Sequence, residues 1–143
     1  MANKSEAVIT HNLYIKWEEK YNLGIPIIDE QHRGLVSLIN TYHYFVINGK
    51  AGVALKPTFI TLAQHTKTHF LTEEDLFEQT EYPEAEQHKK IHEELSIEMR
   101  GVANEAVQEK DFDIVLKFLR KWWLNHIRID DVKYASHVKE KLK

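Results

Sequence analysis

The feature that most constrains the fold is a set of four stripes along which core-facing positions recur at alternating intervals of three and four residues. This spacing places side chains on one face of an α-helix, and four such helices with short links are typical of an up-down-up-down antiparallel bundle. We therefore predict an all-α four-helix bundle. The helices should span about 28–47, from 52–57 to about 80, 83–108, and 111 to at least 127, with a short C-terminal helix after them.

The few glycines and prolines mark the predicted boundaries. Asn48-Gly49 should end the first helix, Pro83 suits the first turn of the third, and Asp111 can cap the fourth. The length of 143 residues suits a single domain over residues 1–143. Residues up to about 26 are expected to form an irregular N-terminal arm, with three aromatic residues that can pack on the core: Tyr14, Trp17 and Tyr21.

Six polar side chains occupy stripe positions that should be apolar. Burying a carboxylate without a partner is very costly, and a buried imidazole needs its nitrogens satisfied. One core histidine is usually just hydrogen-bonded, but these residues occur on all four predicted helices. Antiparallel packing brings their positions to the same end of the bundle. The sequence therefore predicts a buried polar cluster, with these members: His32, His69, Glu73, His88, His92 and His126.

The spacing within the cluster suits metal ligation. His69 and Glu73 are four residues apart, as are His88 and His92, so the paired side chains lie within about 40° of each other on a helix. Asp131 lies five residues after His126, about 140° around a straight helix. It would face the cluster only if the fourth helix ended near residue 128 or contained a π-type bulge. Spacing alone slightly prefers its neighbour, Asp130.

The number and types of the candidate ligands favour two metal ions, with iron as the preferred metal. The chain has nine histidines and no cysteine, which excludes iron–sulfur clusters, thiolate zinc sites and disulfides. Seven candidate ligands exceed one tetrahedral zinc, and imidazole with carboxylate fits iron better than manganese or zinc. The sequence also lacks the Glu-x-x-His motif of bundle enzymes that activate oxygen. A centre with few carboxylates donates less charge to its metals, which favours reversible oxygen binding over cleavage of the oxygen–oxygen bond.

At these residues the chain resembles the hemerythrin family, in particular its bacterial single-domain members, over roughly residues 17–134. Myohemerythrin is itself a known up-down-up-down bundle. The matching segments are Trp17, Asn22-Leu23-Gly24-Ile25, Ile28-Asp29-Glu30-Gln31-His32, the segment from His65 through His69 and Glu73 to Glu74, Tyr82-Pro83, His88 with His92, and Asn125-His126-Ile127 followed by Asp131.

The resemblance implies a definite site. One iron would take His88, His92 and His126, and the other His32 and His69. Glu73 and Asp131 would bridge the two non-haem irons together with an oxo or hydroxo group, so the family pattern selects Asp131 over Asp130. Dioxygen would bind reversibly at the second iron and be held as hydroperoxide, for storage, delivery or scavenging. Two alternatives remain open: an oxygen or redox sensor module acting through a separate partner, and a di-iron enzyme that consumes nitric oxide or peroxide, although the chain is not expected to be an enzyme.

Four apolar residues near the predicted ligands are candidates for an oxygen pocket: Phe70, Trp122, Trp123 and Ile127. Trp123 stands where the family commonly has a smaller residue. Its indole either narrows the pocket or packs on the first helix away from the irons, and Phe70 and Trp122 could equally be plain core. Asp29 either caps the first helix or orients His32, and capping is the preferred interpretation. For His65 we expect a supporting or surface role instead of ligation.

Charge and hydropathy limit the partners. The net charge is -3 and the basic residues form no single tract, so nucleic acid is an unexpected partner. The sequence shows neither an apolar run long enough to span a bilayer nor a signal peptide. We therefore expect no membrane association and a cytoplasmic location, with dioxygen as the partner. The oligomeric state is open, and a monomer is compatible with the sequence.

Overall fold

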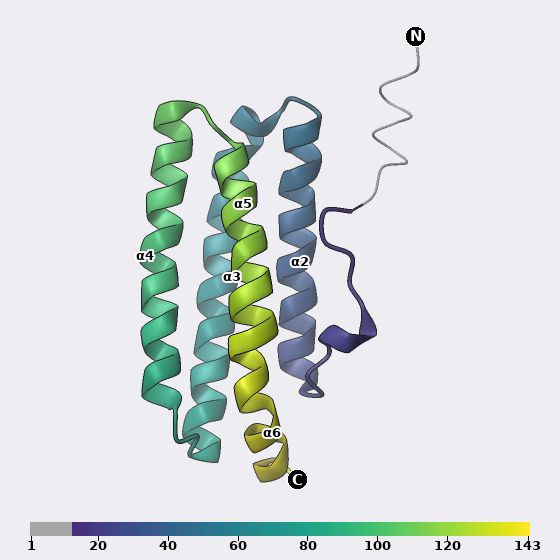
Figure 1. The fold of residues 1–143 in the computed structure, drawn as a ribbon, viewed down its shortest axis with the longest axis vertical. Coiled ribbons are helices and arrows are strands. Elements are labelled where there is room, and N and C mark those ends of the chain that lie inside the picture. Colours follow the sequence, from purple (N-terminus) through teal and green to yellow (C-terminus); the bar gives the residue numbers. More distant parts are fainter. Residues whose placement is uncertain (1–12) are drawn as a thin grey trace.

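The computed structural model describes residues 13–143, in which four long helical columns lie side by side (Figure 1). The first three are α2 (Pro26–Ile47), α3 (Ala51–Thr80) and α4 (Ala85–Glu109). The fourth column runs through α5 (Asp113–Trp122), a π-helical segment η2 (Trp123–Asp130) and α6 (Asp131–Lys141). Links at alternating ends make neighbours antiparallel, and residues 13–143 contain no strand. The predicted all-α four-helix bundle with a C-terminal helical piece is confirmed.

The helix ends follow local chemistry, with small differences from the prediction. Pro26 is the first residue of α2, where its missing N–H costs nothing, and Gly49 ends that helix region with a φ of +69°. Pro83 lies in the turn before α4 and not in its first turn, because α4 begins at Ala85. Asp111 lies one residue before the N-cap position of α5, which is occupied by Phe112. Its Oδ1 accepts a hydrogen bond from the backbone N–H of Asp113, 3.2 Å away.

Asp29 does not cap α2, contrary to the preferred sequence interpretation. Its carboxylate accepts hydrogen bonds from the backbone N–H groups of Leu23 (2.7 Å) and Gly24 (3.1 Å). The N-cap residue of α2 is Ile25, which offers no side-chain acceptor. Asp29 instead fixes the turn that leads into the helix, and Gly24 in that turn has a φ of +85°. The start of α2 is thereby held in place close to His32.

Two apolar clusters enclose a band of buried polar side chains. The larger cluster lies on the side of the polar band where α2 is linked to α3, and the smaller one joins the start of α2, the end of α3 and α6. Along three of the helical columns, a polar residue falls in sequence between a member of one cluster and a member of the other. These are His32 between Ile28 and Leu35, Glu73 between Phe70 and Leu76, and Asp131 between Ile127 and Tyr134. The polar band is therefore sealed by apolar packing on both sides.

The segment before α2 is tied to the bundle by hydrogen bonds and aromatic packing. The Ile15 N–H donates to Asn40 Oδ1, and Asn40 Nδ2 donates back to the Ile15 carbonyl, each at 2.8 Å. The Tyr14 hydroxyl donates to the Leu116 carbonyl at 3.2 Å. Tyr14, Trp17 and Tyr21 pack against the larger apolar cluster, as the sequence predicted. A single 3-10 turn, η1 (Glu19–Tyr21), is the segment's helical part. The N-terminal portion of the predicted arm, residues 1–12, lies outside the described residues.

Helices α2 and α3 approach closely because a glycine faces a histidine. The His65 ring donates through Nε2 to the Gln31 carbonyl, 3.1 Å away. A Cβ added at Gly34 would lie 2.7 Å from Cε1 of this ring, well inside contact distance. His65 thus has a supporting role between helices, as expected. No helix among the described residues is both long and apolar enough to cross a membrane.

We predict that Gly34→Ala destabilises the fold whereas Gly101→Ala stabilises it. Gly101 lies within α4, and a Cβ there would meet nothing within 4 Å, so alanine should add roughly 0.5–1 kcal/mol through its greater helix propensity. At Gly34 the same gain is opposed by displacement of His65, an overpacking cost of about 1–3 kcal/mol. Urea unfolding of both variants checks this, and equal stabilisation by both would contradict the close contact.

Candidate metal centre

All seven predicted ligands meet in the interior of the bundle. His32 comes from α2, His69 and Glu73 from α3, and His88 and His92 from α4, while His126 and Asp131 come from η2 and the start of α6. Each side chain is buried, with at most 5% of the residue surface exposed. The predicted positions at one end of the antiparallel bundle are therefore brought together, and the cluster is compatible with a metal site.

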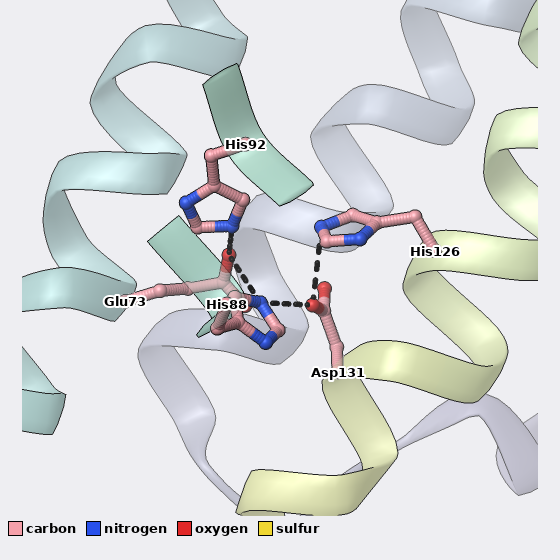
Figure 2. Close-up of side chains that lie close together, drawn as sticks. All are labelled: Glu73, His88, His92, His126 and Asp131. Carbon is pink, nitrogen blue, oxygen red and sulfur yellow. Dashed lines mark ion pairs between the residues drawn. The ribbon is translucent and has the colours of Figure 1, made fainter. Parts of the chain in front are cut away.

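Three histidines and both carboxylates form the first group of ligand atoms (Figure 2). Nε2 of His88 lies 3.0 Å from Asp131 Oδ1, and Nε2 of His126 lies 3.3 Å from the same oxygen. Nε2 of His92 lies 3.1 Å from Glu73 Oε1. The five ligand atoms lie within 4.8 Å of one another, close enough together to contact one cation.

The remaining two histidines form a second group with the same two carboxylates. Nε2 of His32 lies 3.0 Å from Asp131 Oδ2 and 3.2 Å from Nε2 of His69. Nε2 of His69 lies 3.3 Å from Glu73 Oε1. These four ligand atoms also lie within 4.8 Å of one another. The second group therefore offers fewer nitrogen ligands than the first.

The two carboxylates lie between the groups. Asp131 presents Oδ1 to His88 and His126, and it presents Oδ2 to His32 and His69. Glu73 presents Oε1 to histidines of both groups. A carboxylate can bridge two cations, whereas each imidazole Nε2 serves only one. The arrangement is therefore compatible with one cation beside each group of histidines, with Glu73 and Asp131 close to both groups.

The π-helical segment explains why Asp131 reaches the centre. The backbone N–H of Asp131 donates to the carbonyl of His126, five residues earlier, as in a π-helix. With that bonding, residues five apart come to one face. The preference for Asp130 assumed a straight α-helix and is contradicted, because Asp130 Oδ2 lies 3.2 Å from Nδ1 of His126, outside the cluster. A π-type bulge was the condition under which the sequence placed Asp131 at this site.

Three imidazoles bind hydrogen-bond acceptors on their outer side. His92 Nδ1 lies 2.9 Å from Glu74 Oε2, and His69 Nδ1 lies 2.8 Å from Gln31 Oε1. Together with the Asp130 contact, these acceptors place a proton on Nδ1 of each ring and leave Nε2 facing the centre. The supporting roles of Gln31 and Glu74 were not predicted. Each is adjacent in sequence to a predicted ligand, but only the three-dimensional pairing shows which ring it supports.

At this centre, burial and the neighbouring charged groups shift the pKa values of the ligands in opposite directions. Burial alone would raise the pKa of the Asp131 carboxyl, but His126 and hydrogen bonds from neighbouring imidazoles hold this pKa well below its usual range. Burial lowers the pKa of His69, yet Glu73 and Asp131 together raise it above the normal value. For His126 burial prevails and its pKa is lowered. Negative charge is therefore retained on Asp131 inside the bundle, where a cation would be strongly favoured.

The buried atoms without hydrogen bonds are mostly those that face the centre. Among the described residues, they include Nε2 of His88, His92 and His126, Oδ1 of Asp131 and both oxygens of Glu73. These atoms lie near one another without the alignment that a hydrogen bond needs. Unsatisfied buried polar atoms are rare and costly in folded proteins. Such a concentration in one place fits a site whose ligand atoms are satisfied by bound cations.

Apolar and aromatic side chains surround the ligands. The Phe70 ring stacks on the His92 ring at a centroid distance of 3.7 Å and an angle of 7°. Ile127 and Trp122 belong to the larger apolar cluster. Trp123 is 1% exposed and lies 6.2 Å from the His32 ring, 5.8 Å from Trp17 and 5.5 Å from Tyr21, measured between ring centroids. Its indole thus packs mainly on the N-terminal segment and also meets one predicted ligand.

An antiparallel helical bundle with a buried centre of five imidazoles and two carboxylates defines a class, the bundle proteins that bind cations between their helices. Residues 23–138 match the family model of the hemerythrin HHE cation binding domain. A bacteriohemerythrin from Pseudomonas aeruginosa is 34% identical over 133 residues, which cover 90% of this chain and 84% of that protein. A bacteriohemerythrin from Stenotrophomonas maltophilia is 31% identical over 131 residues, which cover 88% of this chain and 82% of that protein. A myohemerythrin from Theromyzon tessulatum is 27% identical over 121 residues, which cover 85% of this chain and 91% of that protein. The chain belongs to the hemerythrin family.

We predict that Trp123→Leu lowers the free energy of unfolding by about 2 kcal/mol or more, because it leaves a cavity among Trp17, Tyr21 and His32. The same variant should make the segment before α2 more susceptible to limited proteolysis. Leu124→Ala in the same π-helical segment is the matched control, since Leu124 is 40% exposed and should change stability little. Unchanged unfolding and proteolysis of Trp123→Leu would show that this packing contributes nothing.

Proposed function

We propose that this protein binds dioxygen reversibly at two non-haem irons. His88, His92 and His126 would hold one iron, His32 and His69 the other, and Glu73 with Asp131 would contact both. The observation that carries the proposal is the placement of Asp131, whose two oxygens face two separate groups of histidine nitrogens. Membership of the hemerythrin family supports iron as the cation and dioxygen as the ligand.

The difference between the two ligand groups supports a binding position for oxygen. The first group has three histidine nitrogens and the second has two, with the carboxylates common to both. An open position on the second metal would be the place where a small ligand enters. When bound, the irons would supply the electrons that dioxygen takes up, while the protein residues fix the geometry around them. No acid–base side chain beyond the ligands is required for binding alone.

The surroundings support reversibility over irreversible oxidation. Phe70, Trp122 and Ile127 are buried in the larger apolar cluster, with exposed fractions of 6%, 2% and 3%, and the Phe70 ring stacks on the His92 ring. We propose that these apolar side chains keep water away from the bound ligand, since water and protons assist loss of reduced oxygen. Trp123 would contribute on the side of His32, where its ring meets the imidazole edge to face.

The test of this function is anaerobic loading with ferrous iron, followed by addition of oxygen and then an inert-gas purge. Two irons per chain should bind, a visible absorption band should develop with oxygen, and the band should disappear on purging. Irreversible conversion to the ferric state would instead indicate an oxidase or a redox sensor. If one iron or none bound per chain, the ligand assignment would be wrong.

We also predict that His126→Ala lowers iron content toward one per chain and abolishes the oxygen-dependent band. The change removes one of three nitrogens from the first group while leaving the second group intact. His137→Ala is the matched control, because His137 lies outside the cluster and its Nε2 donates to the Thr80 carbonyl, 2.7 Å away. Full loading and normal oxygen binding in His126→Ala would remove this residue from the ligand set.

A further inference from the structure

We propose that Glu74, Asp130 and Gln31 are positioning residues that make the two cation positions unequal beyond the difference in histidine number. The position with His88, His92 and His126 would bind a divalent cation first and more tightly, and the position with His32 and His69 would load second and release first. This inference rests on the proposed metal centre. It concerns the residues behind the ligands, which set how strongly each ring donates to a cation.

Carboxylates support two rings of the first group. Glu74 Oε2 lies 2.9 Å from His92 Nδ1, and Asp130 Oδ2 lies 3.2 Å from His126 Nδ1. Carboxylates only accept, so both rings donate from Nδ1 and present Nε2 to the centre. Both carboxylates are partly shielded from water, with about a quarter of each side chain exposed (25% and 24%). Their negative charge therefore acts on the first position at short range.

A neutral amide supports His69 in the second group, and its orientation is fixed by a chain of hydrogen bonds. The Thr72 hydroxyl donates to the Thr68 carbonyl at 2.9 Å. The same hydroxyl oxygen then accepts from Gln31 Nε2 at 3.0 Å. The other end of the amide, Oε1, consequently faces His69 Nδ1 at 2.8 Å. Gln31 thus orients the His69 ring as firmly as Glu74 orients His92, but without adding charge.

The second ring of this group has no such support. His32 is fully buried, and its Nδ1 lacks a hydrogen-bond partner among the described residues. Trp123 packs against the ring, with centroids 6.2 Å apart. The first position therefore has negatively charged supports behind two of its three histidines, and the second has a neutral amide behind one of its two.

The expected consequence follows from imidazole chemistry. A carboxylate that accepts the Nδ1 proton raises the basicity of Nε2, and removal of such a support typically weakens metal affinity by about 10–100-fold. An amide gives the same orientation with less polarisation and no net charge. Because Glu73 and Asp131 contact both positions, they cannot account for a difference in cation affinity between them. Glu74, Asp130 and Gln31 each support a histidine of one position alone, so they can account for it.

The test is a titration of the metal-free full chain with Co²⁺, whose d–d absorption reports the ligand environment, combined with competition by a chelator. Wild type should bind two equivalents in two distinct steps. Glu74→Gln and Asp130→Asn should each weaken the first step by about 10–100-fold with little change in the second. Gln31→Glu should tighten the second step and bring the two affinities closer together, a gain that a folding defect cannot produce.

Asp75→Asn is the matched control for Glu74→Gln. Asp75 is the next residue on α3, is exposed, and bonds to Gln79, so its substitution removes the same charge without touching a ligand. Both steps should stay unchanged in this variant. Two equal binding steps in wild type, or a first step unaffected by Glu74→Gln and Asp130→Asn, would overturn the inference while leaving the metal centre intact. Absence of Co²⁺ binding in wild type would overturn the metal centre itself.

Discussion

The burial of five imidazoles and two carboxylates within one bundle is the constraint on which the rest of the structure depends. Desolvating these groups is costly, and the bundle encloses them between two apolar clusters instead of leaving them near solvent. The ring nitrogens facing outward have hydrogen-bond acceptors in three cases, while most of the ligand atoms facing inward have none. A cation within each ligand group would offset this cost. We infer that the bundle holds an arrangement that cation binding would complete, which links metal loading to stability.

The fourth helical column shows how backbone geometry adapts to this constraint. A regular α-helix would turn Asp130, and not Asp131, toward the face of His126. The π-helical segment changes the register once, so Asp131 enters the centre and Asp130 supports the His126 ring from behind. Single π-helical turns are uncommon and often mark functional positions. The two consecutive aspartates therefore have different roles, and both roles depend on the same local geometry.

Hydropathy spacing was sufficient to predict the helices, their antiparallel order and six buried polar positions. Residues on the buried face of a helix recur in the sequence at intervals of three and four. This spacing could not predict what depends on tertiary contacts. The placement of Asp131 required knowledge of a π-helical turn, which propensity does not reveal, and only the family pattern selected it. Asp29 looked like a helix cap, but its carboxylate binds the preceding turn. Gln31 and Glu74 carry no spacing signal, since each supports a histidine on another helix.

The most direct test of the central claim is anomalous X-ray diffraction at the iron edge from crystals of the iron-loaded protein. Two iron peaks should lie inside the bundle. One should be within coordination distance of Nε2 of His88, His92 and His126, and the other of His32 and His69, with Asp131 contacting both. A single peak, or iron located away from these nitrogens, would contradict the assignment of a shared two-metal centre.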